Sequence, residues 1–370
     1  MTADRKSPSS ARPSSSARPS SARPSSARPS SARPPSFARP PSFARPLSFE
    51  VLMVLALLAA SCALDAQAIG ASGSFDRTLR VSDSVDLSVR TGSGNIRVQT
   101  GAADEVRVVG HIRAHGVLWS GLGADEQVRQ LEANPPIEQK GTTIQIGTIE
   151  DLALRQNVSI SYEITVPPAT RLRSKTGSGN QLIGDIRGPV DAETGSGSIR
   201  AGRIGGHVTL STGSGQIELL RSEEGFEASA GSGSIRAEAV AGPIKARTGS
   251  GRIELAQTAS GAVDVSAGSG RVTIVGVQGP MRLGTGSGNI TVEGRPLGDW
   301  VVHTGSGSVS LRVPPNAAFD LDAETGSGSI DTARPLQVLG TLSRHRLRAT
   351  VGGGGAHVAV STSSGRIRID

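Results

Sequence analysis

The chain has 370 residues and a formal net charge of +7, but the excess positive charge lies in residues 1–68, which hold nine Lys/Arg and three acidic residues. The remainder has 30 basic and 29 acidic residues, which argues against nucleic-acid binding driven by net charge. Aromatic residues make up only 2% of the chain, so the core must be thin and filled by small aliphatic side chains, as in stacked strands.

Residues 1–50 form a low-complexity leader that repeats Ser-Ser-Ala-Arg-Pro and then Pro-Ser-Phe-Ala-Arg-Pro. Such a composition cannot bury enough apolar surface to fold, so we expect this leader to be disordered. Two readings of its origin stay open. It is either a long cationic region in front of an export signal or sequence upstream of a misplaced start codon.

The next segment, residues 51–68, is predicted to be a secretory signal peptide. Its apolar run Val51–Leu64 has 14 residues, fewer than the roughly 20 that a spanning helix needs. The basic flank and the triplet Ala66-Gln67-Ala68 predict cleavage after Ala68. Lipidation of Cys62, after Ala59-Ala60-Ser61, is the alternative. We therefore expect an exported protein, periplasmic or on the surface of a bacterium, which touches a membrane only through its signal peptide or a lipid on Cys62.

Residues 69–168 are predicted to form an N-terminal β cap. Apolar residues alternate from Phe75 onward in short runs bounded by Gly, Ser and Asp, which is typical of strands. The segment Asp125–Ala133 contains helix-forming residues, with Val128 and Leu131 three apart, and predicts one short helix. A cap of this kind would cover the strand edges at one end of a repeat stack.

Residues 169–370 are organised by the recurring motif Thr-Gly-Ser-Gly, which also occurs earlier at Thr91–Gly94. From Gly177 the first glycines of successive motifs are 18 or 19 residues apart, the signature of a repeat architecture. We interpret the glycines as tight turns or points of close backbone approach. These structural turn residues are Gly92, Gly94, Gly177, Gly179, Gly195, Gly197, Gly213, Gly215, Gly231, Gly233, Gly249, Gly251, Gly268, Gly270, Gly286, Gly288, Gly305, Gly307, Gly326 and Gly328.

The repeat predicts an all-β fold, a parallel β-solenoid (β-helix) of about ten coils of 18–19 residues. A hairpin meander with Gly-rich turns is the alternative. The charges favour the solenoid. In all repeats but one, an aliphatic residue stands two positions after the second glycine. The outward residue that follows it reverses its charge from one repeat to the next, from Arg200 to Glu218, Arg236 and Glu254. Parallel strands in register, about 4.8 Å apart, would place these residues side by side as opposite charges.

The motifs lack most residues that phosphate-binding, metal-binding or catalytic sites require. The Gly-x-Gly turns lack the third glycine and the following helix of a phosphate loop, and no Asp follows them as in calcium-binding repeats. His111 and His115 lie in a predicted strand and make a poor metal pair. The outward acids Asp191/Glu193 and Asp320/Asp322/Glu324 are the groups in which a polysaccharide-cleaving site would be sought. We therefore predict no catalytic, cofactor-binding or metal-binding residues.

The chain resembles a family of exported bacterial proteins that are provisionally called adhesins, a domain of unknown function with β-strand repeats. The resemblance lies in Gly73–Leu79, in the recurrent Thr-Gly-Ser-Gly-(Asn/Ser)-Ile-Arg, and in Val166-Pro167-Pro168 followed by repeats. It covers roughly residues 73–370. What it implies is a β-helical, non-catalytic envelope protein, and it brings no binding residues with it.

Together these features predict an exported, non-enzymatic envelope protein that acts as an adhesin-like binding or structural solenoid. Its expected partner is an envelope or surface ligand, with glycans as one class. Two alternatives stay open: a polysaccharide-active β-helix enzyme that uses outward acids, and a sensory or regulatory protein that responds to envelope stress.

Overall fold

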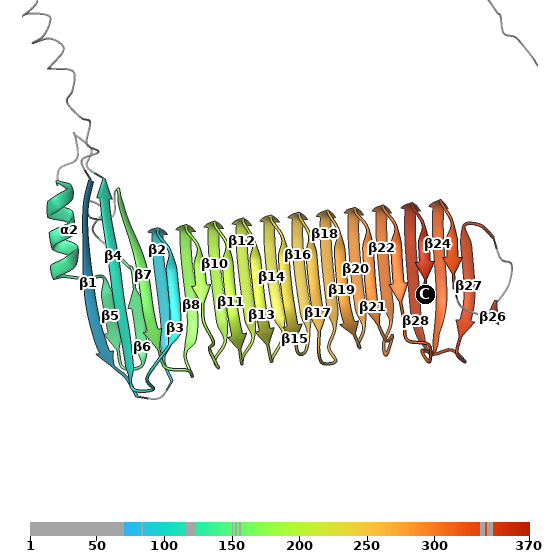
Figure 1. Cartoon of the computed structure of the whole chain (residues 1–370), viewed down its shortest axis with the longest axis horizontal. Coiled ribbons are helices and arrows are strands. Elements are labelled where there is room, and N and C mark those ends of the chain that lie inside the picture. The colour runs from blue at the N-terminus through green and yellow to red at the C-terminus, as the bar shows by residue number, and fades with distance from the viewer. Residues whose placement is uncertain are drawn as a thin grey trace, which may run out of the picture. The chain divides into compact units, whose positions relative to one another are not determined.

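The structure, a computed structural model, describes residues 70–370 except 83, 116–122, 150, 152–153, 155–156, 334–336 and 339–342. Strands of the described residues form two sheets, the first with 14 strands and the second with 15. The strands lie side by side along one axis (Figure 1). The predicted parallel β-solenoid is confirmed, whereas the predicted leader, signal peptide, Ala68 cleavage site and Cys62 lipidation lie outside the described residues.

Both sheets run the length of the stack. The first contains, in spatial order, β1 (Gly70–Arg80), β4 (Glu105–His115), β7 (Val158–Val166), β3 (Ile96–Thr100), β9 (Gln181–Ile183), β11 (Ile199–Ile204), β13 (Ile217–Ser222), β15 (Ile235–Val240), β17 (Ile253–Gln257), β19 (Val272–Val277), β21 (Ile290–Gly294), β23 (Val309–Arg312), β29 (Ile367–Ile369) and β25 (Ile330–Thr332). The second contains β26 (Gln337–Val338), β27 (Arg346–Val351), β24 (Phe319–Ser327), β28 (Ala356–Ser364), β22 (Trp300–Ser306), β20 (Met281–Ser287), β18 (Val263–Ser269), β16 (Ile244–Ser250), β14 (Phe226–Ser232), β12 (Val208–Ser214), β10 (Val190–Ser196), β8 (Arg171–Ser178), β2 (Asp86–Ser93), β6 (Thr143–Ile146) and β5 (Ile137–Lys140).

Each coil of the repeat contributes one strand to each sheet. In one coil, β10 ends at Ser196 in the second sheet, the chain turns over Gly197 and Ser198, and β11 begins at Ile199 in the first sheet. β11 pairs in parallel with β13, which aligns Ile199 with Ile217. A spacing of 18 residues in the sequence is therefore one full coil.

The core is the narrow space between the two sheets. Alternate residues of each strand face it, so that β11 buries Ile199, Ala201 and Ile204 and exposes Arg200. The few large rings, including Trp300 and Phe226, are fully buried in this space. Burial of these apolar columns, at about 25 cal/mol per Å² of apolar surface removed from water, is the main favourable term that holds the coils together.

The N-terminal end is covered by antiparallel strands and one helix. β4 pairs antiparallel with both β1 and β7, and α2 (Ala124–Ala133) packs on β1 through the buried side chains of Val128 and Leu131. The Glu132 carboxylate accepts a hydrogen bond of 2.8 Å from the Ser74 backbone N–H. The predicted helix over 125–133 is confirmed, with one more residue at its start. Among the described residues, no helix has the length and apolar character that a membrane span requires.

The coils follow the order of the sequence except near the two ends of the stack. The coil of β2 and β3 lies beside β8 and β9, although residues 101–170 separate them in the chain. At the other end, the C-terminal coil of β28 and β29 lies between β22 and β24 and between β23 and β25. The C-terminal coil is therefore inserted out of chain order.

Candidate functional site

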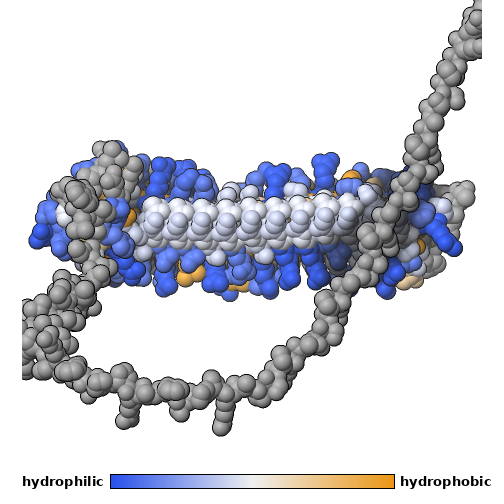
Figure 2. Space-filling model, turned by 90° about the horizontal axis from the view of Figure 1, so that it is seen from above, coloured by the Kyte–Doolittle hydropathy of each residue, from blue (hydrophilic) through white to orange (hydrophobic). Residues whose placement is uncertain are grey.

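The Thr-Gly-Ser-Gly motifs stack into one continuous corner of the solenoid, which we call the corner ridge: the two glycines and the serine of each motif. Figure 2 shows it as a pale band along the stack, between rows of strongly hydrophilic side chains. The serines, such as Ser196 and Ser214, are exposed. The ridge thus presents rows of hydroxyl groups and bare backbone without charge, repeated at the spacing of the strands.

Close approach of neighbouring coils explains the glycines. A Cβ atom added to Gly197 would lie 2.0 Å from the carbonyl oxygen of Gly179, and one added to Gly215 would lie 2.0 Å from that of Gly197. The first glycine of a motif is also crowded, because a Cβ on Gly195 would lie 2.6 Å from the Gly177 carbonyl oxygen. Any side chain at these positions would push the coils apart, so the ridge is bare for a structural reason.

The threonine of the motif has a role that the sequence analysis missed. Its side chain points inward and is buried, as for Thr194, which is 1% exposed. In most coils its hydroxyl donates to the carbonyl oxygen of the second glycine in the adjacent coil, at 3.1 Å from Thr194 to Gly179 and 2.9 Å from Thr212 to Gly197. The buried Thr285 hydroxyl is an exception and has no such partner among the described residues. The threonines therefore hold the ridge in register from the core side and are not available to a ligand.

Asparagine side chains fix some corners in the same way. Asn95, Asn180 and Asn289 follow the second glycine of their motifs. Each accepts a hydrogen bond of 2.9 Å through Oδ1 from a backbone N–H of the next coil: that of Asn180, Ser198 and Ser308, respectively. These side chains satisfy backbone donors at the turn and serve the fold.

The outward faces of both sheets carry the predicted ladder of opposite charges. Arg200, Glu218, Arg236 and Glu254 are direct neighbours in the parallel register, as predicted. The Arg200 Nε lies 2.6 Å from the Glu218 carboxylate. On the second sheet, Lys245 and Glu227 approach to 2.6 Å. These charged groups therefore form ion pairs between neighbouring coils.

The two acid groups singled out from the sequence are also engaged. Glu193 lies 2.8 Å from the Lys175 ammonium group, and Asp191 is aligned with Arg173. Asp322 contacts Arg348 at 3.0 Å and Arg346 at 3.6 Å. In addition, the Thr350 hydroxyl donates to Asp320 at 2.9 Å. Both groups are thereby tied to neighbouring strands.

The inserted C-terminal coil brings together side chains that the sequence separates widely. His303 on β22 lies beside Ser361 on β28, with 2.9 Å between Nδ1 and the hydroxyl oxygen. Glu324 on β24 is aligned with Ser361 from the other side. Since His303 and Ser361 are 58 residues apart and the coils are out of order, no sequence spacing pointed to this group.

The outward-facing pair His111 and His115 lies on β4, as expected for residues of a strand. Within the described ranges, no group of three or more His, Cys, Asp or Glu side chains is placed to hold a metal ion.

Shifted pKa values occur in the cap. The Arg107 guanidinium donates a hydrogen bond of 2.5 Å to Asp76, which lowers the pKa of that carboxyl below its ordinary value of 3.8. Burial raises the pKa of the Tyr162 phenol, whose ring lies 6.4 Å from that of Phe75. Both effects have structural causes, an ion pair between β1 and β4 and packing in the cap core.

An open hollow of about 740 Å³ lies at the opposite corner of the coils, near β19, β21 and β23. Val275 and Leu297 are exposed there, Leu297 to 63%. Arg295 and Arg312 also line it, and neither forms an ion pair with the described residues. Glu293 lines the same hollow and is aligned with Arg312 on the neighbouring strand, so the hollow carries charges of both signs beside its apolar side chains.

Comparison with known proteins identifies the repeat region. Residues 208–370 match the model of a family described as Toastrack DUF4097. No curated protein matches the chain.

Similar solved structures include an adhesin, provisionally so described, from Bacteroides fragilis, with 13% identity, a TM-score of 0.33, and coverage of 80% of this chain and 97% of that chain. Another, from Parabacteroides distasonis and described in the same way, has 11% identity, a TM-score of 0.29 and the same coverage. A third, provisionally described as a cell adhesion protein from Clostridium sporogenes, has 11% identity, a TM-score of 0.17, and coverage of 80% and 99%. These descriptions apply to the solved proteins and not to this chain.

Proposed function

Since residues 208–370 belong to the Toastrack DUF4097 family, we propose that this chain is an exported, non-catalytic protein of the bacterial cell envelope that binds a polymeric envelope or surface ligand. The corner ridge is the observation that carries this proposal. It offers the same uncharged group of hydroxyls and backbone at each coil, so a ligand with its own repeat could contact many coils at once. Many weak, linked contacts can give a high overall affinity.

The chemistry of the ridge favours a neutral, hydroxyl-rich ligand such as a glycan. Exposed serines such as Ser214 and Ser250 can each donate and accept hydrogen bonds. The flanking charges are largely paired between coils, as between Arg200 and Glu218, so they would not dominate recognition. Export is supported by the sequence of residues 51–68 and is part of the proposal.

Sedimentation with isolated cell-wall polysaccharide would test the binding surface. The double substitution Ser214→Glu and Ser250→Glu adds charge to the ridge at exposed positions, and we expect it to abolish co-sedimentation. Ser266→Glu is the matched control, because Ser266 lies on the outward face of β18 beside Arg247, away from the ridge. Binding that is unaffected by the ridge substitutions would refute the ridge as the binding surface.

A second candidate function, cleavage of a polysaccharide, is favoured by one observation. His303 and Ser361 lie 2.9 Å apart, and Glu324 is aligned with Ser361 on the next strand. These groups could transfer a proton to or from a bound sugar. The test is release of reducing ends from envelope glycans. If the wild-type chain releases them and both His303→Ala and Glu324→Gln do not, this candidate replaces the non-catalytic proposal.

A further inference from the structure

The C-terminal coil, residues 356–370, occupies a slot between two coils that are consecutive along the chain. β28 pairs in parallel with β22 on one side and with β24 on the other. β29 pairs in the same way with β23 and β25. Because β24 and β25 precede it in the sequence, this coil reaches its place by insertion and not by addition at the end of the stack.

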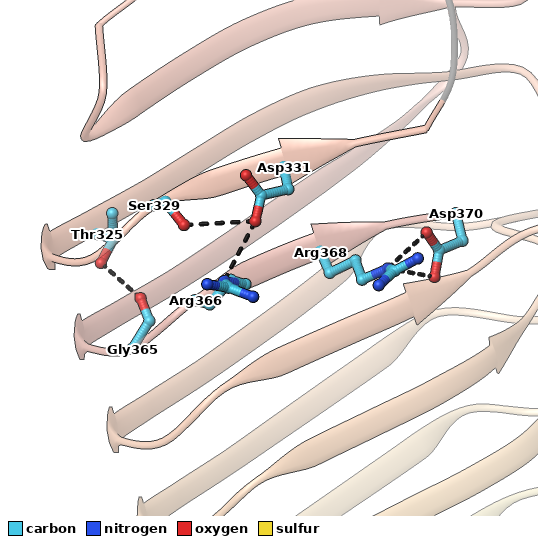
Figure 3. A network of polar contacts seen from close by, with 7 residues as sticks. All are labelled: Thr325, Ser329, Asp331, Gly365, Arg366, Arg368 and Asp370. Carbon is cyan, nitrogen blue, oxygen red and sulfur yellow. Dashed lines mark hydrogen bonds and ion pairs between the residues drawn. The ribbon is translucent and has the colours of Figure 1, made fainter.

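The slot recognises the inserted coil from both sides. The Thr362 hydroxyl donates to the Gly307 carbonyl oxygen at 3.1 Å, and the Thr325 hydroxyl donates to the Gly365 carbonyl oxygen at 3.0 Å. Figure 3 shows the second of these bonds, together with the ion pair of 3.2 Å between Arg366 and Asp331 on β25. Apolar side chains complete the fit, and Val358, Val360, Ile367 and Ile369 are all buried to 99% or more.

The two walls of the slot also match each other. Thr362 is aligned with Thr304 of β22 and with Thr325 of β24, and Ser364 is aligned in the same way with Ser306 and Ser327. Elsewhere in the stack, motifs in this alignment pair directly, as those of β10 and β12 do. The slot therefore offers a coil with this motif the same register on both sides as a place inside the regular stack.

The connection into the inserted coil consists of four glycines, Gly352–Gly355. All four have positive φ angles, of 60°, 95°, 85° and 153°. They carry the chain around the start of β24, since Val351 and Ala356 pair with Phe319 from opposite sides. Glycine alone adopts such a run of angles without a steric penalty, and it also gives the link the freedom to adopt others.

From these features we propose that the C-terminal coil is an exchangeable insert and that its slot is a binding site for residues 356–370 of a second copy of the chain. Exchange would join two copies through their C-terminal ends with the same contacts as in one copy. The tether holds a chain's own coil near the slot at an effective concentration of the order of millimolar. A dilute chain therefore keeps its own coil, and exchange requires crowding of copies.

The test uses the full chain with Gly365→Val, because a Cβ at Gly365 would lie 2.0 Å from the Gly307 carbonyl oxygen and its own coil could not seat. A fluorescent peptide of residues 356–370 is then added and its anisotropy is measured. We expect saturable binding of one peptide per variant chain, at least tenfold weaker binding to the wild-type chain, and no binding of a peptide that itself carries Gly365→Val. A variant chain that is folded but does not bind the wild-type peptide would overturn the proposal.

Hydrogen exchange on the wild-type chain provides a test that does not depend on folding of the variant. If the inserted coil can leave by itself, amides of residues 356–369 exchange together and faster than those of β12 and β13 in the middle of the stack. Equal protection of the two regions would contradict the proposal. Exchange between copies is read directly by refolding a mixture of light and isotope-labelled chains at high concentration. Mixed dimers are expected from wild-type chains and not from the Gly365→Val chain, and wild-type chains that stay monomeric would contradict a second copy as the occupant.

Discussion

The hydroxyl of Thr212 donates a hydrogen bond of 2.9 Å to the carbonyl oxygen of Gly197 in the preceding coil. The same bond recurs along the ridge, from Thr194 to Gly179 and from Thr248 to Gly233. It satisfies a backbone acceptor at the point where glycine permits the closest approach of two coils. Thr and Gly of the motif therefore act as one unit, with the Gly setting the distance and the Thr setting the register.

Removing this hydroxyl should weaken the stack. We expect Thr212→Ala to lower the free energy of unfolding by about 0.5–1.5 kcal/mol, the usual net value of one hydrogen bond, and Thr212→Ser to lower it less. The reverse change, Ala230→Thr, should add stability, since Ala230 holds the same position one coil later. Denaturant unfolding followed by circular dichroism measures all three. A Thr212→Ala chain as stable as the wild type would show that the bond contributes nothing.

The second glycine of the motif should not tolerate a methyl group. We expect Gly197→Ala to destabilise the chain by about 1–3 kcal/mol, because its Cβ would lie 2.0 Å from the Gly179 carbonyl oxygen. Gly284→Ala is the matched control, since a Cβ there has no heavy atom within 4 Å. Thermal unfolding of the two variants side by side gives the comparison. Equal stability of the two would contradict close approach as the reason for glycine.

Reversing one charge of the ladder should be costly in low salt. Glu218→Arg would place a third positive charge between Arg200 and Arg236, and we expect a loss of about 0.2–1 kcal/mol for each neighbour. Thr209→Arg is the control, since it adds the same side chain between Asp191 and Glu227 and should be neutral or stabilising. Unfolding at low and at 1 M salt separates the effects, because screening weakens exposed pairs. A loss that is the same at both salt concentrations would not be electrostatic.

Tyr162 provides a test of the cap, because it is the only tyrosine of the chain. Burial raises the pKa of its phenol above the ordinary value of 10.0. The neutral phenol therefore stabilises the cap fully below pH 10, and this contribution is lost as the pH rises above that value toward the folded-state pKa. Ultraviolet titration should show no phenolate near pH 10 in the folded chain, and ionisation near pH 10 in denaturant. Phenolate in the intact fold at pH 10 would contradict the burial.

The repeat region was largely predictable from the sequence for a physical reason. Parallel strands in register place residues 18 positions apart side by side. The spacing and the alternating charges of Arg200, Glu218, Arg236 and Glu254 were therefore enough to predict that these residues are neighbours. The helix at Ala124–Ala133 was also signalled, since its apolar residues lie three apart.

The order of the coils near the C-terminus was not predictable. Thr325 begins a Thr-Gly-Ser-Gly motif, Thr362 begins the closely similar Thr-Ser-Ser-Gly, and the two are aligned in neighbouring strands. Local sequence therefore does not distinguish chain order from insertion. The group of His303, Ser361 and Glu324 depends on that insertion and was missed with it. The role of the motif threonine was missed because alternation along the strand gives its burial but not the partner of its hydroxyl.

The most direct test of the proposed envelope role is protease treatment of intact cells that produce the protein, followed by mass spectrometry of the released peptides and of the mature N-terminus. A surface-binding solenoid predicts release of peptides from residues 169–370 without lysis, and a mature chain that starts after Ala68 or at a lipidated Cys62. Peptides that appear only after the inner membrane is opened, from a chain that retains residues 1–68, would contradict export and the proposed function with it.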